Sequence, residues 1–205
     1  MLHGRLGSLP HQVLLLPAAA VYAFTQQPLS LFEWLRSPWE NLDGHNEELW
    51  LNLFLGYMIK DLVSMPLTMS MLTFWVHHVA SGIIAMTFLF HSPPCIFIVG
   101  GTLCELGSAT QSYFYLSGLH RYSAAYWIHS IGMTVTNLGS VALVAFFMFG
   151  QTLTPFPARA FFSLVSLLMF SGRQMFCANN LRDSVEQSKS GGGVGVDKKE
   201  MAKGD

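Results

Sequence analysis

The chain is short of charged residues. Aspartate, glutamate, lysine and arginine make up 11% of its 205 residues, whereas a soluble domain usually carries about 25%. Hydrophobic residues make up 51%, and they include 16 Phe and 5 Trp. Lipid rather than water is therefore the expected solvent for most of the surface, and the composition predicts a polytopic membrane protein.

An excess of positive charge and a set of paired cysteines are also missing. The 11 Lys and Arg are balanced by 12 Asp and Glu, so the formal net charge is -1. Such a chain has no field that would attract nucleic acid, and we expect no nucleic-acid partner. Cys95, Cys104 and Cys177 lie far apart in or beside apolar stretches and form no CxxC motif. We expect them to be buried apolar side chains rather than a disulfide framework.

Six apolar stretches approach the length of roughly 20 residues that crosses a bilayer as a helix. They are residues 9–24, 49–65, 70–90, 94–116, 123–149 and 158–178. The first is short and contains proline, and a signal peptide is its alternative interpretation because Arg5 precedes the apolar core. The sequence therefore predicts an all-α, polytopic membrane bundle of about six transmembrane helices.

The polar segments divide the chain into four parts. Residues 1–24 hold the short first helix, and residues 25–48, rich in acids, prolines and tryptophans, are expected to form an extramembrane loop. Residues 49–182 form the main helical membrane domain, and residues 183–205 are expected to be a disordered tail. Lysine and arginine in short connections favour the cytoplasmic side. Arg5, Arg121 and the basic tail then place both termini in the cytoplasm.

Two adjacent histidines, His77 and His78, interrupt the third apolar stretch. Ionisable groups at bilayer depth are costly, and they persist mainly where they face a bundle interior, pair with one another or do chemistry. Consecutive side chains on a helix diverge by about 100°, so one ring can enter a cavity while the other contacts a neighbouring helix. Ser81 is within reach of either ring. The alternative is that the histidines only bridge helices through hydrogen bonds.

A lone carboxylate, Glu105, lies in the fourth apolar stretch. Gly101, Glu105, Ser108 and Ser112 recur at spacings of four, three and four, so they share one face of the expected helix. An isolated carboxylate in apolar surroundings is expected to be either protonated or partnered. This face is therefore the predicted wall of a polar site.

Other stretches add further candidates for the same site. The second contains Tyr57 and Asp61, and Asp61 is a possible partner for one of the histidines. In the fifth, His129 is followed by small residues at spacings of three and four, so helix packing is the alternative to a functional role. In the sixth, Arg173 lies near the cytoplasmic end of its helix and is a candidate to reach inward.

Three short motifs resemble the TLC-domain family, which includes ceramide synthases, translocating-chain-associated proteins and lipid-homeostasis proteins. They are GYMIKD, then WVHHVA, whose first histidine follows Asp61 by sixteen residues, and then LCELGS. The resemblance covers roughly residues 50–176. It implies a bundle of about six helices around a lipid-accessible cavity, in the endoplasmic reticulum or another endomembrane.

The resemblance also implies roles for some residues. In ceramide synthases, paired histidines and two downstream aspartates are implicated in catalysis. His77 and His78 match the histidine positions, whereas the two acidic positions fall on Glu105 and Ser108, so the second acid is missing. The following ATQSYF also departs from the proline and Asn-x-Arg pattern of the non-synthase branch. The resemblance therefore selects neither branch.

Two functions remain as hypotheses. In the first, the protein binds or senses a membrane lipid or an acyl chain, needs no cofactor and acts in membrane lipid homeostasis. In the second, it is an acyltransferase with acyl-CoA as a substrate, in which His77 or His78 is the base and Glu105 orients the imidazole. A transporter that relays protons is a further alternative. A metal site is disfavoured, because metal-binding histidines usually lie four residues apart. The oligomeric state is left open.

Overall fold

The structure is a computed structural model that describes residues 8–42, 44–64, 72–90 and 93–189. Within these ranges the elements are helices and there is no strand, which confirms the predicted all-α fold for this part of the chain. In chain order they are η1 (His11–Leu15), α2 (Leu16–Thr25), α3 (Leu31–Arg36), η2 (Trp39–Asn41), α4 (His45–Ser64), α5 (Leu72–Phe90), α6 (Pro94–Leu116), α7 (Ala124–Gly150) and α8 (Phe156–Lys189).

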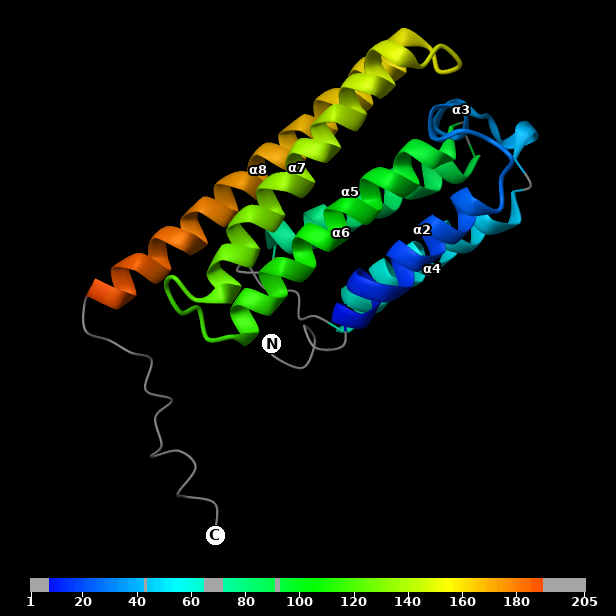
Figure 1. The fold of residues 1–205 in the computed structure, drawn as a ribbon. Coiled ribbons are helices and arrows are strands. Elements are labelled where there is room, and N and C mark those ends of the chain that lie inside the picture. Colours follow the sequence, from blue (N-terminus) through cyan, green and yellow to red (C-terminus); the bar gives the residue numbers. More distant parts are fainter. Residues whose placement is uncertain (1–7, 43, 65–71, 91–92, 190–205) are drawn as a thin grey trace.

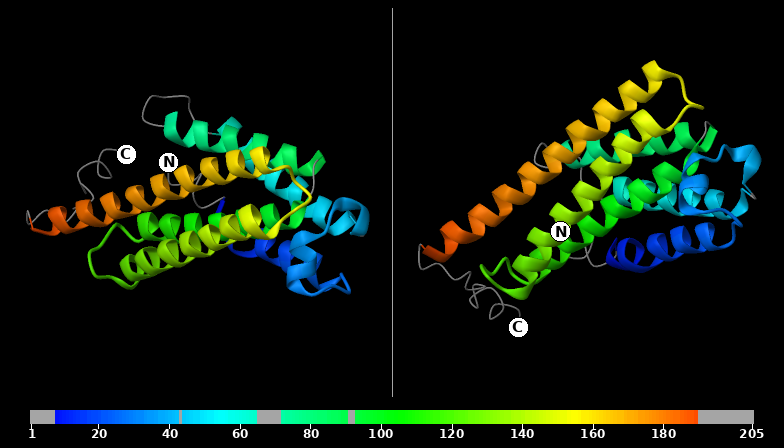
Figure 2. Two further views of the ribbon diagram at one scale, coloured as in Figure 1. Left: turned by 90° about the horizontal axis from the view of Figure 1, so that it is seen from above. Right: turned by 45° about the horizontal axis from the view of Figure 1, so that its top comes forward.

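The long helices form one bundle in which α6 is central (Figure 1). Helices α7 and α8 pack together as a long antiparallel pair, and α6 packs along α7. On the other side α2 packs on α4, and α6 also contacts η1, α2 and α4. Helix α5 has its main contacts with α4 and α6. The two further views in Figure 2 show the same arrangement from above and at an oblique angle.

The chain passes up and down through this bundle. The start of η1, the turn between α6 and α7, and the end of α8 lie at one end, whereas α3 and the turn between α7 and α8 lie at the other (Figure 1). The two ends of the described chain are therefore on the same side of the bundle. This topology is compatible with the prediction that both termini are cytoplasmic, which stays a prediction.

The helix bounds follow the predicted apolar stretches closely, with two differences. Helix α4 begins at His45 rather than residue 49, after Gly44, whose φ of +79° suits a residue without a side chain. Helix α8 continues to Lys189, past the predicted start of the tail at residue 183. Apolar length limits only the part of a helix that lies in lipid, and no Gly or Pro occurs between Gly172 and Lys189 to end the helix earlier.

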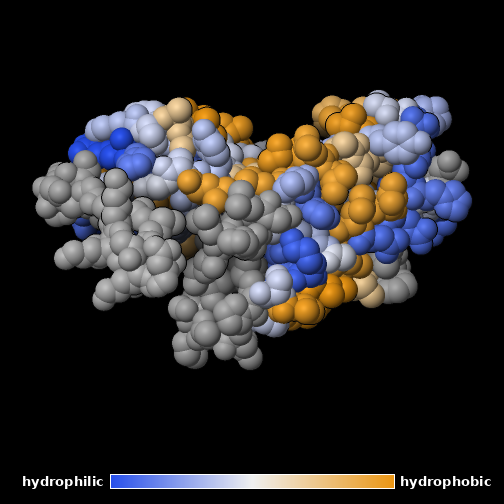
Figure 3. Space-filling model, turned by 90° about the horizontal axis from the view of Figure 1, so that it is seen from below, coloured by the Kyte–Doolittle hydropathy of each residue, from blue (hydrophilic) through white to orange (hydrophobic). Residues whose placement is uncertain are grey.

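The outer surface of the bundle is strongly apolar. Val63 and Phe149 are each 82% exposed, and Ile83 and Leu138 are also exposed. Figure 3 shows broad apolar areas on one face, with hydrophilic side chains at both sides of it and a further hydrophilic group between the apolar areas. Soluble monomers rarely expose apolar patches of this extent. Within the described residues, α7 and the Phe156–Glu186 part of α8 are long and apolar enough to cross a membrane. A bundle of six spans stays a prediction.

The segment expected to be an extramembrane loop contains a folded cap. Helix α3 starts with a capping box, in which the backbone of Glu33 donates to the Ser30 hydroxyl and Glu33 accepts from the Ser30 backbone. The hydrogen bond from the Ser30 side chain also lowers the pKa of Glu33. Trp34 Nε1 donates to Glu47 Oε1 over 2.8 Å, and both side chains are buried. This hydrogen bond holds α3 against the first turn of α4.

Trp50 is the central apolar side chain between α2, α4 and α6. It is fully buried, stacks on Phe54 and meets Phe97 edge to face. Its Nε1 donates to the backbone oxygen of Leu16 over 3.0 Å. A Cβ atom at Gly101 would lie 2.6 Å from Trp50 Cη2. Glycine at 101 is therefore what lets α6 approach the tryptophan.

Candidate functional site

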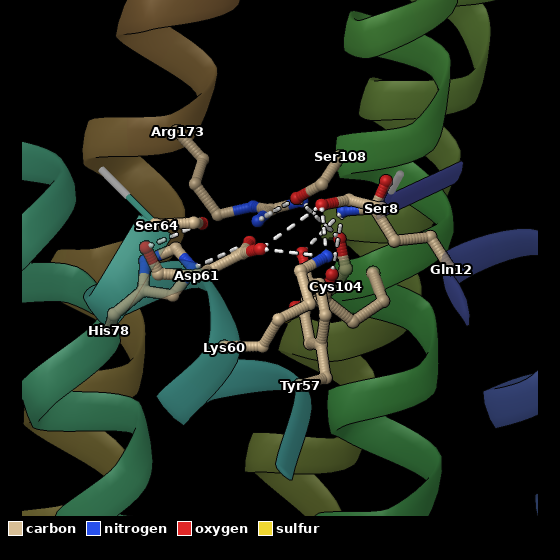
Figure 4. Close-up of polar contacts among 11 residues, drawn as sticks. Ser8, Gln12, Tyr57, Lys60, Asp61, Ser64, His78, Cys104, Ser108 and Arg173 are labelled. Atoms are coloured by element: carbon tan, nitrogen blue, oxygen red, sulfur yellow. Dashed lines mark hydrogen bonds and ion pairs between the residues drawn. The ribbon is translucent and has the colours of Figure 1, made fainter. Parts of the chain in front are cut away.

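Polar side chains from five segments meet inside the otherwise apolar bundle (Figure 4). They come from the N-terminal segment, α4, α5, α6 and α8. We name this group the central polar cluster, and its members are Ser8, Gln12, Tyr57, Lys60, Asp61, His78, Glu105, Ser108 and Arg173. Buried polar groups need hydrogen-bond partners or opposite charges to offset their lost hydration. The contacts within the cluster supply them.

Asp61 holds one half of the cluster together. Its Oδ2 lies 3.5 Å from His78 Nε2, and its Oδ1 lies 3.1 Å from Lys60 Nζ. Ser8 Oγ also donates to Oδ1 over 3.1 Å. Asp61 and His78 are both buried. The prediction that Asp61 partners a histidine of the next helix is confirmed, and the histidine is His78.

Glu105 is the acid of the other half. It is buried, and Gln12 Nε2 donates to its Oε2 over 2.9 Å. The same Nε2 lies 2.9 Å from the Tyr57 hydroxyl, which is positioned between Glu105 and Asp61. Glu105 therefore has a partner, as expected. The carboxylate within 4 Å of His78 Nε2 is that of Asp61, however, so the carboxylate that can orient this imidazole is Asp61 and not Glu105.

Arg173 reaches into the bundle from α8, as the sequence suggested. Its Nη2 donates to the backbone oxygen of Cys104 over 2.6 Å, its Nη1 to Ser108 Oγ over 3.1 Å, and its Nε to Asn137 Oδ1 over 3.4 Å. These three bonds join α8 to α6 and α7. The guanidinium charge is also close enough to Glu105 to interact with it. Ser108, at the position of the missing second acid, accepts a hydrogen bond from this arginine.

The two histidines line different hollows. His77 lines a pocket of about 90 Å³ between α5, α6, α7 and α8, together with Ser81, Gly101 and Glu105. His78 lines an open, mainly apolar groove of about 620 Å³ between α4 and α5. The pocket has room for several water molecules or a short stretch of hydrocarbon chain, whereas the volume of the groove is within the range of roughly 300–1,000 Å³ that is usual for ligand sites. The predicted divergence of the two rings is therefore confirmed, and each ring faces a separate space.

Two predicted residues lie outside this arrangement. Ser112 is buried on α6 but is not part of the lining of either hollow. His129 is buried on α7, where its ring stacks on Phe114 at 5.3 Å and its Nδ1 lies 3.5 Å from Thr110 Oγ1. These contacts are the packing role that was the alternative for His129.

The N-terminal segment contributes two residues that the sequence analysis did not select, Ser8 and Gln12. Gln12 lies in the first apolar stretch, and Ser8 directly precedes that stretch. The two residues are four positions apart and so share one helix face, which is the signal that could have identified them. Gln12 lies in a turn of π-helix, His11–Leu15, which is followed by Leu16 and Pro17 at the start of α2. Proline lacks the N–H of a regular helical bond, and single π-helical turns are frequent at functional sites.

The chemistry open to the site follows from these donors and acceptors. Within the described ranges, no three His, Cys, Asp or Glu side chains are grouped closely enough to hold a metal ion. No protein-family model, curated protein or solved structure matches the chain. The contacts of the central polar cluster and the two hollows beside it are therefore the basis on which a function is proposed.

Proposed function

We propose that this chain is a multi-pass integral membrane protein of the TLC type that binds a membrane lipid or an acyl chain and acts in membrane lipid homeostasis. It would cross the membrane six times and reside in the endoplasmic reticulum or another endomembrane. Both termini would face the cytoplasm. The observation that carries the proposal is the pocket between α5, α6, α7 and α8. It has His77 and Glu105 on one part of its wall and phenylalanines on another.

This division suits an amphipathic ligand. Phe147, Phe162 and Phe170 offer an apolar surface to a hydrocarbon chain, whereas His77 and Glu105 can meet a polar head group. Ligand sites commonly combine mostly apolar walls with a few placed polar groups. The strongly apolar outer surface of the bundle would bring the pocket into the bilayer, where such ligands are abundant.

The polar groups beside the pocket favour a head group that donates hydrogen bonds. Glu105 supplies carboxylate oxygens, and Gln12 Oε1 is buried without a hydrogen-bond partner among the described residues. The hydrogen-bond donors of Arg173 are directed at Cys104, Ser108 and Asn137. A hydroxyl or amine head group therefore fits better than a phosphate, whose negative charge would face Glu105.

Gly100 offers a direct test of this pocket. It lines the pocket, and no described neighbour, its own helix backbone apart, lies within 4 Å of the place that a Cβ would take. Leucine at this position should fill the space without an initial clash. We expect Gly100→Leu to retain about tenfold less co-purified lipid, because the leucine side chain would occupy space that the lipid needs. A change of one or a few methylene groups in an apolar pocket usually alters ligand affinity by about this factor. Mass spectrometry of the purified protein measures the bound lipid.

Gly172→Leu is the matched control for this experiment. Gly172 is exposed on α8 and is equally free of described neighbours within 4 Å of an added Cβ, but it is not part of the pocket lining. It imposes the same change of residue type in a long helix, so lipid retention should equal that of the wild type. Equal retention by Gly100→Leu and Gly172→Leu would contradict lipid binding in this pocket.

The pairing of Asp61 with His78 favours acyl transfer from acyl-CoA as a second candidate function. In this reaction His78 would accept the proton of a lipid hydroxyl or amine while the oxygen or nitrogen of that lipid group attacks the thioester carbonyl. The carbon–sulfur bond then breaks, and the proton passes to the departing CoA thiolate. Asp61 would orient the imidazole and balance its charge, as carboxylates do for catalytic histidines. Acyl-CoA consumption with a panel of acceptor lipids tests this candidate.

A further inference from the structure

Ser163 is a buried hydroxyl that the proposed head-group site does not use. It lies near the start of α8, is 7% exposed and lines the same pocket as His77 and Glu105. Its Oγ finds no hydrogen-bond partner among the described residues. A buried hydroxyl without a partner loses its hydration without compensation. This hydroxyl is therefore open to a partner in the pocket, either water or a polar group of a bound ligand.

Other serines and threonines in the helices of the bundle make a hydrogen bond to their own helix backbone that Ser163 does not make. A serine or threonine within a helix can donate to the carbonyl four residues earlier. Helices α5 to α8 contain several such bonds, made by Thr87, Thr102, Ser108, Thr134, Ser140 and Ser171. Ser163 makes no such bond, although it lies in the same kind of helix. Its hydroxyl is thus available to the pocket.

The distance between Ser163 and the polar cluster defines what could bind it. On α8, Ser163 precedes Arg173 by ten residues, which corresponds to about 15 Å along the helix axis. Phe147 and Phe162 line the same pocket as Ser163, together with the serines Ser140 and Ser166. A head group held beside Arg173 is therefore separated from this hydroxyl by nearly three turns of α8. The partner would be a second polar group, well along the chain of the ligand.

We propose that Ser163 is a ligand-binding residue and that the lipid bound here is a single-chain lipid with an oxygen substituent, a hydroxyl or keto group, partway along its chain. This inference rests on the proposed lipid-binding function of the pocket and adds the class of lipid to it. The Ser163 hydroxyl donates to this oxygen, or accepts from it when the substituent is a hydroxyl. One such hydrogen bond selects the oxygenated chain over the plain one.

The test compares two neutral ligands with the full-length protein in lipid nanodiscs. One is the glycerol monoester of octadecanoic acid, and the other is the same monoester with a single hydroxyl near the middle of the chain. Native mass spectrometry measures the Kd of each. We expect the wild type to bind the hydroxylated ligand about five- to tenfold more tightly, which is the usual effect of one buried hydrogen bond. An isomer with the hydroxyl beside the ester should bind like the plain ligand.

Variants of two serines on the same helix complete the test. Ser163→Ala should lose the preference and keep the affinity for the plain ligand. Ser171→Ala, which removes an exposed hydroxyl bonded to Leu167, should keep the preference. Alanine is the best helix former, so neither change should impair folding. Binding of both ligands without preference, or the same preference in Ser163→Ala, overturns the role of Ser163 alone. Absence of binding for either ligand overturns the proposed lipid pocket as well.

Discussion

Acyl-CoA consumption is expected to fall by about 10²- to 10⁴-fold in His78→Ala if the protein is an acyltransferase. The size of the effect follows from the loss of the one histidine that lies within 4 Å of a carboxylate among the described residues. His78 is buried beside Asp61 and lines the open groove between α4 and α5, through which a lipid acceptor could reach it. The measurement is release of free CoA by purified protein with acyl-CoA and a panel of lipid alcohols and amines.

Two further variants make this result specific. Asp61→Asn retains the size of the side chain but removes its charge, and it should also lower turnover because the imidazolium formed in the reaction loses its balancing carboxylate. His120→Ala changes an exposed histidine outside the cluster and should leave turnover unchanged. Turnover that survives in His78→Ala would exclude this residue as the base. A well-folded wild type without turnover on any acceptor would exclude acyl transfer and leave lipid binding.

Trp50→Ala is expected to reduce the free energy of unfolding by about 3 kcal/mol. This value is at the lower end of the range for a buried tryptophan replaced by alanine, because lipid tails are as apolar as the protein interior and the classical hydrophobic contribution is small. What is lost is the stacking on Phe54, the edge contact with Phe97 and the hydrogen bond to the Leu16 backbone. Chemical unfolding in detergent, followed by circular dichroism, measures the change.

Trp127 provides the comparison for Trp50. It lies on α7 with half of its surface exposed, so Trp127→Ala should cost less than about 1 kcal/mol. A similar loss of stability in both variants would mean that Trp50 does not have the central packing role described above. The Trp50 variant should also bind less lipid, because its ring supports Gly101 in the pocket wall.

The helices could be predicted from the sequence because apolar length is a strong signal. The predicted stretch 94–116 coincides with α6, and the stretch 123–149 is displaced by one residue from α7. The length of an apolar stretch gives no information about the part of a helix that continues into water. It therefore could not predict the last turns of α8, nor the short helix α3, whose marker was the Ser30 and Glu33 spacing of a capping box.

The site was predictable where ionisable residues stood out from apolar surroundings. His77, His78, Asp61 and Glu105 were selected for that reason, and the structure places all four at the central polar cluster or the pocket beside it. The neutral side chain of Gln12 carries no such signal, although it bonds to Glu105. Which of the two histidines pairs with Asp61 also could not be predicted, because it depends on how neighbouring helices are rotated about their axes.

The docking of Gln12 has a consequence for the order in which the protein is made. Its partners Tyr57 and Glu105 follow it by 45 and 93 residues in the chain. The first helix is therefore synthesised well before α6, which carries Glu105. The hydrogen bond between Gln12 and Glu105 can form only after α6 has been synthesised, and contacts between residues so far apart in the chain form slowly. Assembly of the central polar cluster is thus a late event of biogenesis, completed only after α8, which carries Arg173, has been synthesised.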